Sequence, residues 1–391
     1  MAKVAVDTLE SSDARHEARR AIQVMLFPGV PSLIIDTMQF PQTFGEGDIH
    51  NFNQQFIAIL EELRRDVQKK GLDLTGYDHR YLKRLRDIGR AAFNQVLPPA
   101  AREWIIELEQ QEQKRGLGLT FKTPPTSSLF WEMLYAGKPF EVESNQFWGF
   151  RYPMGRTYWQ IEAPDRVHLQ MGIFSAVHDK LSSSRQEVEQ LVHHMVQISQ
   201  QLGSELTWRV LDQAIPLESL STENVIELFH SDQFRYGIVH FACHCENPEN
   251  VGAMQACLSF TACEKEIGVF LEDLLTWQDY GFVHRPFVFL NACESATPGH
   301  LLQAINFPTG ILNFGAGGAI ATACAIPDNF ASAFASEFYR RLLGKPLSNL
   351  PANIGETLLE TRLHFLREFN NPLGLAYSLY AVSNQQLRLM D

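Results

Sequence analysis

The hydrophobic pattern in the first third of the chain predicts a short strand region followed by amphipathic helices. Residues 21–38 are strand-like, with closely spaced apolar positions. Residues 52–69 and 81–112 instead place apolar side chains at helical spacing with charges between them, as at Ile57 and Leu60. Nothing on these two stretches clusters into a site, and so we expect them to be packing helices.

After the prolines at 124 and 125 the pattern alternates between strands and helices. Ser184 and Glu187 form the capping-box pattern at the start of one helix. This alternation predicts an α/β fold with a parallel sheet covered by helices on both faces. The predicted strands are 167–177, 205–211, 237–243 and 286–290, and the predicted helices are 184–201, 222–230 and 330–343.

Composition narrows the function classes. The chain has 391 residues and a formal net charge of −12, which would repel a phosphate backbone, and so we expect no direct nucleic-acid binding. Its longest apolar stretches are far shorter than a membrane-spanning helix, and so we expect no membrane insertion. Residues 1–20 carry charges and no apolar run, which predicts a flexible polar tail and a cytoplasmic protein.

Two reactive residue types stand at the ends of predicted strands. His244 follows the strand 237–243, and Cys293 closely follows the strand 286–290. Because catalytic groups gather at the carboxyl ends of parallel strands, we expect the two side chains to lie together. A cysteine thiol is weakly ionised at neutral pH, and an imidazole that accepts its proton makes it a nucleophile. The order, with histidine first and cysteine 49 positions later, is similar to that of caspases.

The other histidine and the cysteines of this region have structural interpretations. Strand alternation puts His240 on the same face as His244, and we expect His240 to be a core histidine outside the site. All six cysteines fall after residue 242, and we expect reduced thiols. A zinc site is disfavoured because alternation would point Cys243 and Cys245 away from His244. We expect no metal and no cofactor.

Several segments resemble the CHAT family, a caspase-like group of cysteine proteases. Residues 239–244 (Val-His-Phe-Ala-Cys-His) are similar to the strand that ends in the catalytic histidine of that family, and 289–296 (Phe-Leu-Asn-Ala-Cys-Glu-Ser-Ala) to the strand that ends in its catalytic cysteine. Further similar segments are 129–135, 148–153, 315–320, 326–328 and 338–344. The resemblance covers residues from about 125 to 391, and the helical segment 85–108 belongs with it.

This resemblance implies a caspase-like fold with helix-flanked parallel or mixed sheet. It divides the chain into a strand and helical segment with a non-catalytic half, 21–215, and a catalytic half, 216–391. It also implies that His244 and Cys293 form the catalytic dyad and that the backbone N–H groups of Cys245 and Cys293 form the oxyanion hole. The family usually has glycine where this chain has Cys245, and a requirement for positive φ there would strain the loop.

Three nearby features keep two interpretations each. Asp328 is either the N-cap of the helix 330–343 or an acid near a pocket for a basic P1 side chain. Asn291 and Glu294 could orient the nucleophile or satisfy backbone groups at a turn. The glycine-rich segment 315–318 (Gly-Ala-Gly-Gly) is not followed by the lysine of a phosphate-binding loop. It predicts a tight turn before a strand.

The sequence therefore predicts a cysteine endopeptidase. By resemblance, it would cleave one specific partner protein, such as a gasdermin-like substrate, in bacterial antiviral defence or regulated cell death. The same resemblance implies that an activating sensor or regulatory protein controls it. Two alternatives stay open at this point: a catalytically silent caspase-like scaffold, and a non-proteolytic thiol hydrolase or transferase that uses the same dyad.

Overall fold

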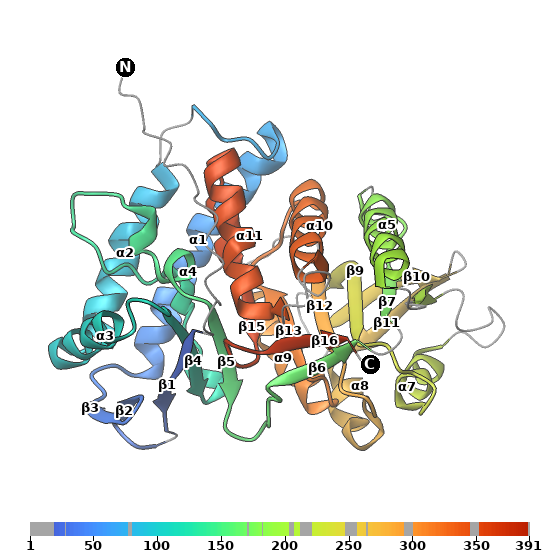
Figure 1. The fold of residues 1–391 in the computed structure, drawn as a ribbon, viewed down its shortest axis with the longest axis horizontal. Helices are drawn as coiled ribbons and strands as arrows, with labels where there is room; N and C mark the ends of the chain where they lie inside the picture. Colours follow the sequence, from blue (N-terminus) through green and yellow to red (C-terminus); the bar gives the residue numbers. More distant parts are fainter. Residues whose placement is uncertain are drawn as a thin grey trace.

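The computed structural model describes residues 19–27, 29–76, 80–169, 172–181, 183–202, 207–211, 221–246, 256–262, 265–292, 300–344 and 352–389. In these ranges the chain forms a five-stranded sheet, an eight-stranded sheet and a three-stranded sheet, with helices around them (Figure 1). The predicted α/β class, with a mixed sheet flanked by helices, is confirmed.

The first sheet has the strand order β3-β2-β1-β4-β5. Its strands are β1 (Arg20–Leu26), β2 (Ser32–Ile35), β3 (Met38–Pro41), β4 (Leu117–Thr123) and β5 (Met154–Tyr158). β1, β4 and β5 are parallel, whereas β2 and β3 form an antiparallel edge. The strand-like region predicted at 21–38 is confirmed, and Asp36, with a positive φ of 57°, makes the turn between β2 and β3.

The helices of the first part of the chain pack beside this sheet. They are α1 (Glu46–Lys70), α2 (Arg80–Val96), α3 (Pro99–Gln111) and the short α4 (Trp148–Arg151). The stretch predicted as helical over 81–112 divides between α2 and α3 because Pro98 and Pro99 lack the N–H that a continuous helix needs. The apolar stripe of α1, including Leu60, is buried as its spacing predicts.

The eight-stranded sheet carries the predicted site. Along its main path the strand order is β11-β10-β9-β12-β13-β15, and β7 pairs with both β8 and β9. β7, β8, β9, β12 and β13 are parallel to one another, and β10, β11 and β15 are antiparallel to their neighbours. The strands are β7 (Gly172–Val177), β8 (Thr207–Val210), β9 (Ile238–Glu246), β10 (Cys257–Ala262), β11 (Lys265–Phe270), β12 (Phe287–Ala292), β13 (Gly318–Thr322) and β15 (Tyr377–Tyr380).

Strand β9 is longer than the sequence predicts. The predicted strand ends at residue 243, but β9 continues through Glu246, and so His244 lies inside the strand. The reason is a change of partner on one side of β9: β7 pairs with it only as far as Ala242, and β10 pairs with it from His244 onward. The pairing with β10 joins segments that local sequence pattern does not connect.

Helices cover both faces of this sheet (Figure 1). α5 and α10 lie on one face, where Ile238 and Phe289 join the larger hydrophobic core. α7, α8 and α9 lie on the other face, where Val239 and Val288 join a second core. This alternation explains why β9 and β12 read as almost continuous apolar runs. The helices are α5 (Ser184–Leu202), α7 (Thr222–His230), α8 (Leu271–Thr276), α9 (His300–Asn313), α10 (Asp328–Gly344) and α11 (Ile354–Phe369).

A three-stranded sheet forms from β14 (Ala352–Asn353), β16 (Gln386–Leu389) and β6 (Arg166–Leu169). The sequence predicts one strand over 167–177, whereas the structure divides this stretch into β6 and β7. β6 pairs with β16 near the C-terminus, and β7 enters the large sheet. Long-range pairing therefore overrides a uniform local strand propensity.

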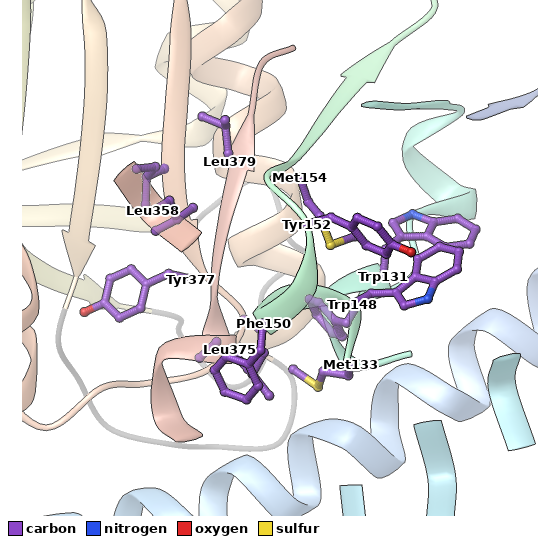
Figure 2. Packing of buried hydrophobic residues seen from close by; sticks show 14 of the residues in the cluster. Trp131, Met133, Trp148, Phe150, Tyr152, Met154, Leu358, Leu375, Tyr377 and Leu379 are labelled. Carbon is purple, nitrogen blue, oxygen red and sulfur yellow. The ribbon is translucent and has the colours of Figure 1, made fainter. Parts of the chain in front are cut away.

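The two large sheets meet where β15 lies beside β5, and a hydrophobic core fills this seam (Figure 2). Trp131 and Trp148 from the first-sheet side and Leu358 from α11 belong to the same core. Apolar burial of this extent is the main stabilising contribution to such a junction.

Three charged side chains are buried in this seam. Arg156 of β5 donates to the carboxylate of Glu132 and, over 2.9 Å, to the hydroxyl of Ser378. Arg362 of α11 donates to the carbonyl of Tyr377, and its Nη2 lies 3.7 Å from Glu132 Oε1. Because all three charged side chains are at most 2% exposed, each depends on the others for compensation.

Some expectations about the chain are not tested. Residues 1–18 of the predicted tail lie outside the described residues, and so does the predicted boundary at 215. β7 and β8 precede that boundary yet pair into the eight-stranded sheet, and the division into halves stays a prediction. Among the described helices, none combines the length and hydropathy needed to cross a membrane.

Candidate functional site

The carboxyl ends of β9 and β12 lie side by side at one edge of the large sheet. The two strands are parallel, and Ala292, the last residue of β12, is the Cα partner of Cys243. His244 is the next residue of β9. Cys293 follows Ala292 in the sequence but lies outside the described residues. The strand that leads to Cys293 thus runs directly beside the strand that carries His244.

A second histidine accompanies His244. The His178 ring lies 4.4 Å from the His244 ring, centroid to centroid, in an edge-to-face arrangement with an interplanar angle of 70°. His244 is half-buried and is the Cα partner of Ser259 in β10. The contact with His178 limits the directions in which the His244 imidazole can turn.

Local structure explains the position of His178. It directly follows β7, and its backbone N–H donates to the carbonyl of Ala242 over 2.8 Å, which extends the pairing with β9 by one residue. The backbone N–H of Lys180 donates to His178 Nδ1 over 3.2 Å. In the neutral ring this bond leaves the proton on Nε2. The side chain is fixed in both place and tautomer.

Glu266 of β11 supplies a negative charge on the other side of His178. Its Oε1 lies 3.6 Å from His178 Nε2. The hydroxyl of Ser259 donates to Oε1 over 2.7 Å, and Lys180 Nζ donates to Oε2 over 3.1 Å. The bond from Ser259 and the bond from Lys180 lower the pKa of Glu266 to about 2. Glu266 is therefore ionised at neutral pH.

Burial lowers the pKa of His178, and the neighbouring His244 lowers it further, although Glu266 opposes this shift. His178 is therefore neutral at physiological pH. The arrangement places a fixed negative charge, a neutral imidazole and His244 in succession.

The cysteines next to His244 differ in burial. Cys243 is fully buried, and burial raises its pKa well above the ordinary value, so that it stays a thiol. Burial has the same effect on Cys324. Cys245 is half-buried and lies in β9 opposite Leu258. Cys243, Cys245, Cys257 and Cys324 form no disulfide bond with one another.

Cys245 does not adopt the strained backbone considered from the sequence. Among the described non-glycine residues, positive φ occurs at Asp36, Arg285 and Asn370. Cys245 is an extended strand residue. A side chain at this position therefore brings no left-handed strain in this conformation.

His240 is a core histidine, as its alternation with His244 predicts. It is fully buried, and its Nδ1 lies 3.1 Å from the hydroxyl of Tyr339 in α10. Its Nε2 lies 2.8 Å from Oε1 of Glu187 in α5, but without the angle of a hydrogen bond. Its side chain faces α5 and α10.

Asn291 anchors the end of β12. Its Nδ2 donates to Glu187 Oε1 over 2.7 Å and to the carbonyl of Ala331 over 3.0 Å, and its Oδ1 accepts from the hydroxyl of Tyr377 over 2.9 Å. These bonds tie β12 to α5, α10 and β15. The sequence left two interpretations of Asn291 open. Its described bonds satisfy the backbone carbonyl of Ala331, and they also fix the strand that precedes Cys293. Glu294 lies outside the described residues.

Two further residues that the sequence singled out, Asp328 and Gly315, lie in the described part of the chain. Asp328 is the first residue of α10 and is half-buried, so that its carboxylate lies at the positive end of the helix dipole. Gly315, with a φ of +97°, forms the tight turn predicted before β13. In the described part of the chain, no three histidine, cysteine or acidic side chains are grouped closely enough to hold a metal ion.

Sequence reasoning missed His178, Ser259 and Glu266. A signal existed for His178 alone, because it stands immediately after a predicted parallel strand, as His244 was expected to do. Ser259 and Glu266 reach the site through the β10–β11 hairpin, whose pairing with β9 has no local sequence signal.

Comparison with known proteins gives one family and one curated relative. The model of the CHAT domain matches residues 86–372. The match includes the helical segment 85–108 almost entirely and ends before β15. A protein named "Probable protease" from Vitiosangium sp. (strain GDMCC 1.1324) is 35% identical over 114 residues, which cover 29% of this chain and 14% of that protein.

Two solved structures are similar to this chain at much lower sequence identity. The crystal structure of the Arg-specific cysteine proteinase gingipain R has 11% identity and a TM-score of 0.43, covering 96% of this chain and 79% of that chain. The Saccharomyces cerevisiae separase–securin complex contains a chain with 12% identity and a TM-score of 0.38, covering 90% of this chain and 23% of that one.

Proposed function

The chain belongs to the CHAT domain family, and from this premise we propose that it is a cysteine endopeptidase in which His244 activates Cys293. The observation that carries the proposal is the parallel register of β9 and β12, in which Ala292 pairs with Cys243. A nucleophile that follows β12 and a base one residue beyond Cys243 would leave neighbouring strands at the same edge of the sheet.

In the proposed mechanism, His244 takes the proton of the Cys293 thiol, and the thiolate attacks the carbonyl carbon of a peptide bond. The carbonyl electrons move to the oxygen, where the backbone N–H groups of Cys245 and Cys293 would stabilise the negative charge. Collapse expels the amine, which takes its proton from His244. Water then attacks the thioester carbonyl carbon and gives a proton to His244; the C–S bond breaks, the carboxylic acid product leaves, and His244 returns the proton to the Cys293 thiolate.

The surroundings of His244 suit this role. During the cycle His244 becomes an imidazolium, and a neutral His178 beside it avoids repulsion between two cations. The ionised Glu266 contacts His178, with its Oε1 3.6 Å from His178 Nε2, and so helps to hold that ring in place. His178 would thus be a positioning residue, and Cys293 and His244 the catalytic residues.

Substrate and regulation are proposed on the family resemblance. The protein would cleave one specific partner protein, for which a gasdermin-like protein is the leading candidate, within bacterial antiviral defence or regulated cell death. An activating sensor or regulatory protein would control it. Asp328, half-buried at the start of α10, would contribute to a pocket for a basic P1 side chain.

The test is cleavage of a random peptide library by the wild-type chain, Cys293→Ala and His244→Ala, followed by mass spectrometry. We expect cleavage by the wild type, a kcat/KM about 100-fold to 10,000-fold lower for His244→Ala, and no cleavage by Cys293→Ala. Cleavage after Lys or Arg that weakens in Asp328→Asn would support the acidic pocket. Equal cleavage by wild type and Cys293→Ala would overturn the proposal.

One observation favours a second candidate, a catalytically silent scaffold. His244 and Cys245 lie within β9 and pair with β10, instead of standing beyond the end of the strand. An electrophilic peptide probe separates the two candidates. Labelling of Cys293 that disappears in His244→Ala supports the endopeptidase, whereas no labelling in the presence of partner proteins supports the scaffold.

A further inference from the structure

A cleft far from the β9 and β12 edge lies among α2, α3 and α4. Its volume is about 580 Å³, which is in the range of clefts that bind ligands. In Figure 1, α2 and α3 lie at the opposite side of the molecule from α5 and β10. The proposed peptidase mechanism uses none of its residues.

The cleft carries positive charge in an acidic protein. Arg90, Arg102 and Arg151 line it together with Glu103 and Glu109, in a chain whose formal net charge is −12. Glu109 is already bound, because Arg151 Nη2 donates to it over 2.7 Å and the hydroxyl of Tyr152 donates to its other oxygen. The three arginines outnumber the two glutamates of the lining, and one of these glutamates is already paired with Arg151.

Neither Arg90 nor Arg102 contacts a carboxylate within the described residues. Arg90 donates to the carbonyl of Gly137, and Arg102 Nη1 donates to the Asn94 side chain over 2.5 Å. Arg102 Nε is buried and makes no hydrogen bond in the described structure. A buried donor without an acceptor costs free energy, and the guanidinium of Arg102, which lines the cleft and is half-buried as a residue, can pair with an anion through its other donors.

Exposed apolar side chains accompany these arginines. Ile106 lines the cleft and is 52% exposed, and Phe140, on the segment that joins the cleft residues Ala136 and Gln146, is 93% exposed. Large apolar side chains exposed beside a cleft are typical of protein interaction sites. Phe140 lies outside the cleft lining, so a partner that contacted both Phe140 and the cleft would be larger than a small molecule.

From this geometry we propose that the cleft binds an acidic segment of a partner protein. A carboxylate of the segment pairs with Arg102 and Arg90, and a neighbouring apolar side chain packs on Ile106. Nucleic acid fits less well, because the formal net charge of −12 would repel a phosphate backbone and because Trp148 and Tyr152 in the lining are only 1% and 3% exposed. This binding does not depend on the peptidase activity.

The experiment selects a random displayed peptide library on the full chain carrying Cys293→Ala, so that no peptide can be cleaved. Selections on two further variants, Arg102→Glu and Lys114→Glu, run in parallel. Lys114 is exposed, follows α3 and lies outside the cleft, so its replacement is a matched charge reversal. We expect enrichment of peptides with Asp or Glu next to Leu, Ile or Phe, lost with Arg102→Glu and kept with Lys114→Glu.

A recovered peptide, labelled with a fluorophore, then gives affinities. Arg102→Glu should weaken binding about tenfold or more, and Ile106→Ser, at a position that is 52% exposed, about fivefold or more. Basic or neutral enriched peptides, no enrichment, or binding unchanged by both Arg102→Glu and Ile106→Ser would overturn the proposal. A failed proposal here leaves the cleavage assay unaffected.

Discussion

The chemistry of the candidate site is set by how single side chains are held. His178 is neutral and fixed by a backbone N–H on Nδ1, and Glu266 is held ionised by Ser259 and Lys180. Neither of these two residues is expected to touch a substrate. We expect them to act on His244 through the His178 ring, which lies 4.4 Å from the His244 ring, and the lowered pKa of His178 makes pH dependence the readout.

Replacement of His178 tests this role. Because the folded pKa of His178 is lowered, its unfolded form binds a proton at a higher pH than its folded form. Its share of the stability is therefore present above an unfolded pKa of about 6.5 and is lost as pH falls below it. We expect the Tm to drop less on acidification in His178→Gln than in the wild type.

The exposed His50 provides the matched control, His50→Gln. Both variants and the wild type would be unfolded thermally at several pH values. The kcat/KM profile is the second readout, and His178→Gln should change its acidic limb without removing activity. A Tm profile and a rate profile that both superimpose on those of the wild type would rule out the positioning role.

At the scale of elements, the site depends on how β12 is fastened. Asn291 connects it to α5, α10 and β15 through three hydrogen bonds. These bonds restrict Asn291, which directly precedes Ala292. This would fix the direction in which the chain leaves the sheet towards Cys293.

Asn291→Ala should lower the free energy of unfolding by about 1–3 kcal/mol, because Glu187 and the Tyr377 hydroxyl lose a buried partner. Peptide cleavage should fall as well. Urea unfolding at neutral pH measures the first effect, and Asn145→Ala, at an exposed position, controls for the loss of an amide. Equal stability of the two variants would mean that the Asn291 bonds contribute nothing.

Local pattern predicted the elements that local interactions decide. Amphipathic spacing identified α1, and apolar runs identified β9 and β12, because a strand buried on both faces needs apolar side chains throughout. Non-local pairing decided the rest. β9 extends through His244 because β10 pairs with it, and the stretch 167–177 divides because β16 takes its first part.

Prediction of the candidate site followed the same rule. His244 was predicted from its place at the end of a strand, and the core role of His240 from strand alternation. Glu266 could not, because it reaches His178 only after β11 folds onto β10 and β10 onto β9. The contact between His178 and Glu266 depends on three strand pairings, β7 with β9, β9 with β10 and β10 with β11. Local sequence pattern predicts none of them.

At the scale of the whole molecule, the seam between the two large sheets is charged as well as apolar. Glu132 lies within reach of both Arg156 and Arg362, and all three are buried. Burial lowers the pKa of Arg362 to about 10, with Glu132 opposing the shift, and so Arg362 stays charged at neutral pH. One carboxylate thus serves two buried cations.

Glu132→Gln should therefore lower the free energy of unfolding by about 3–5 kcal/mol, the usual effect of breaking a buried ion pair from one side. Glu62→Gln is the control, because Glu62 pairs with Arg84 on the surface and its loss should cost about 0–1 kcal/mol. Urea denaturation of both variants gives the comparison. A loss for Glu132→Gln as small as that for Glu62→Gln would refute the account of the seam.

The seam also bears on how this chain can change over evolutionary time. Glu132 and Arg156 come from the first-sheet side of the seam, whereas Arg362 and Ser378 come from α11 and β15. A recombinant that took one side from a relative with an apolar seam would bring an unmatched charge into a dry interior. These four positions are therefore expected to be inherited as a unit, which would keep the two sheets from being exchanged as independent modules.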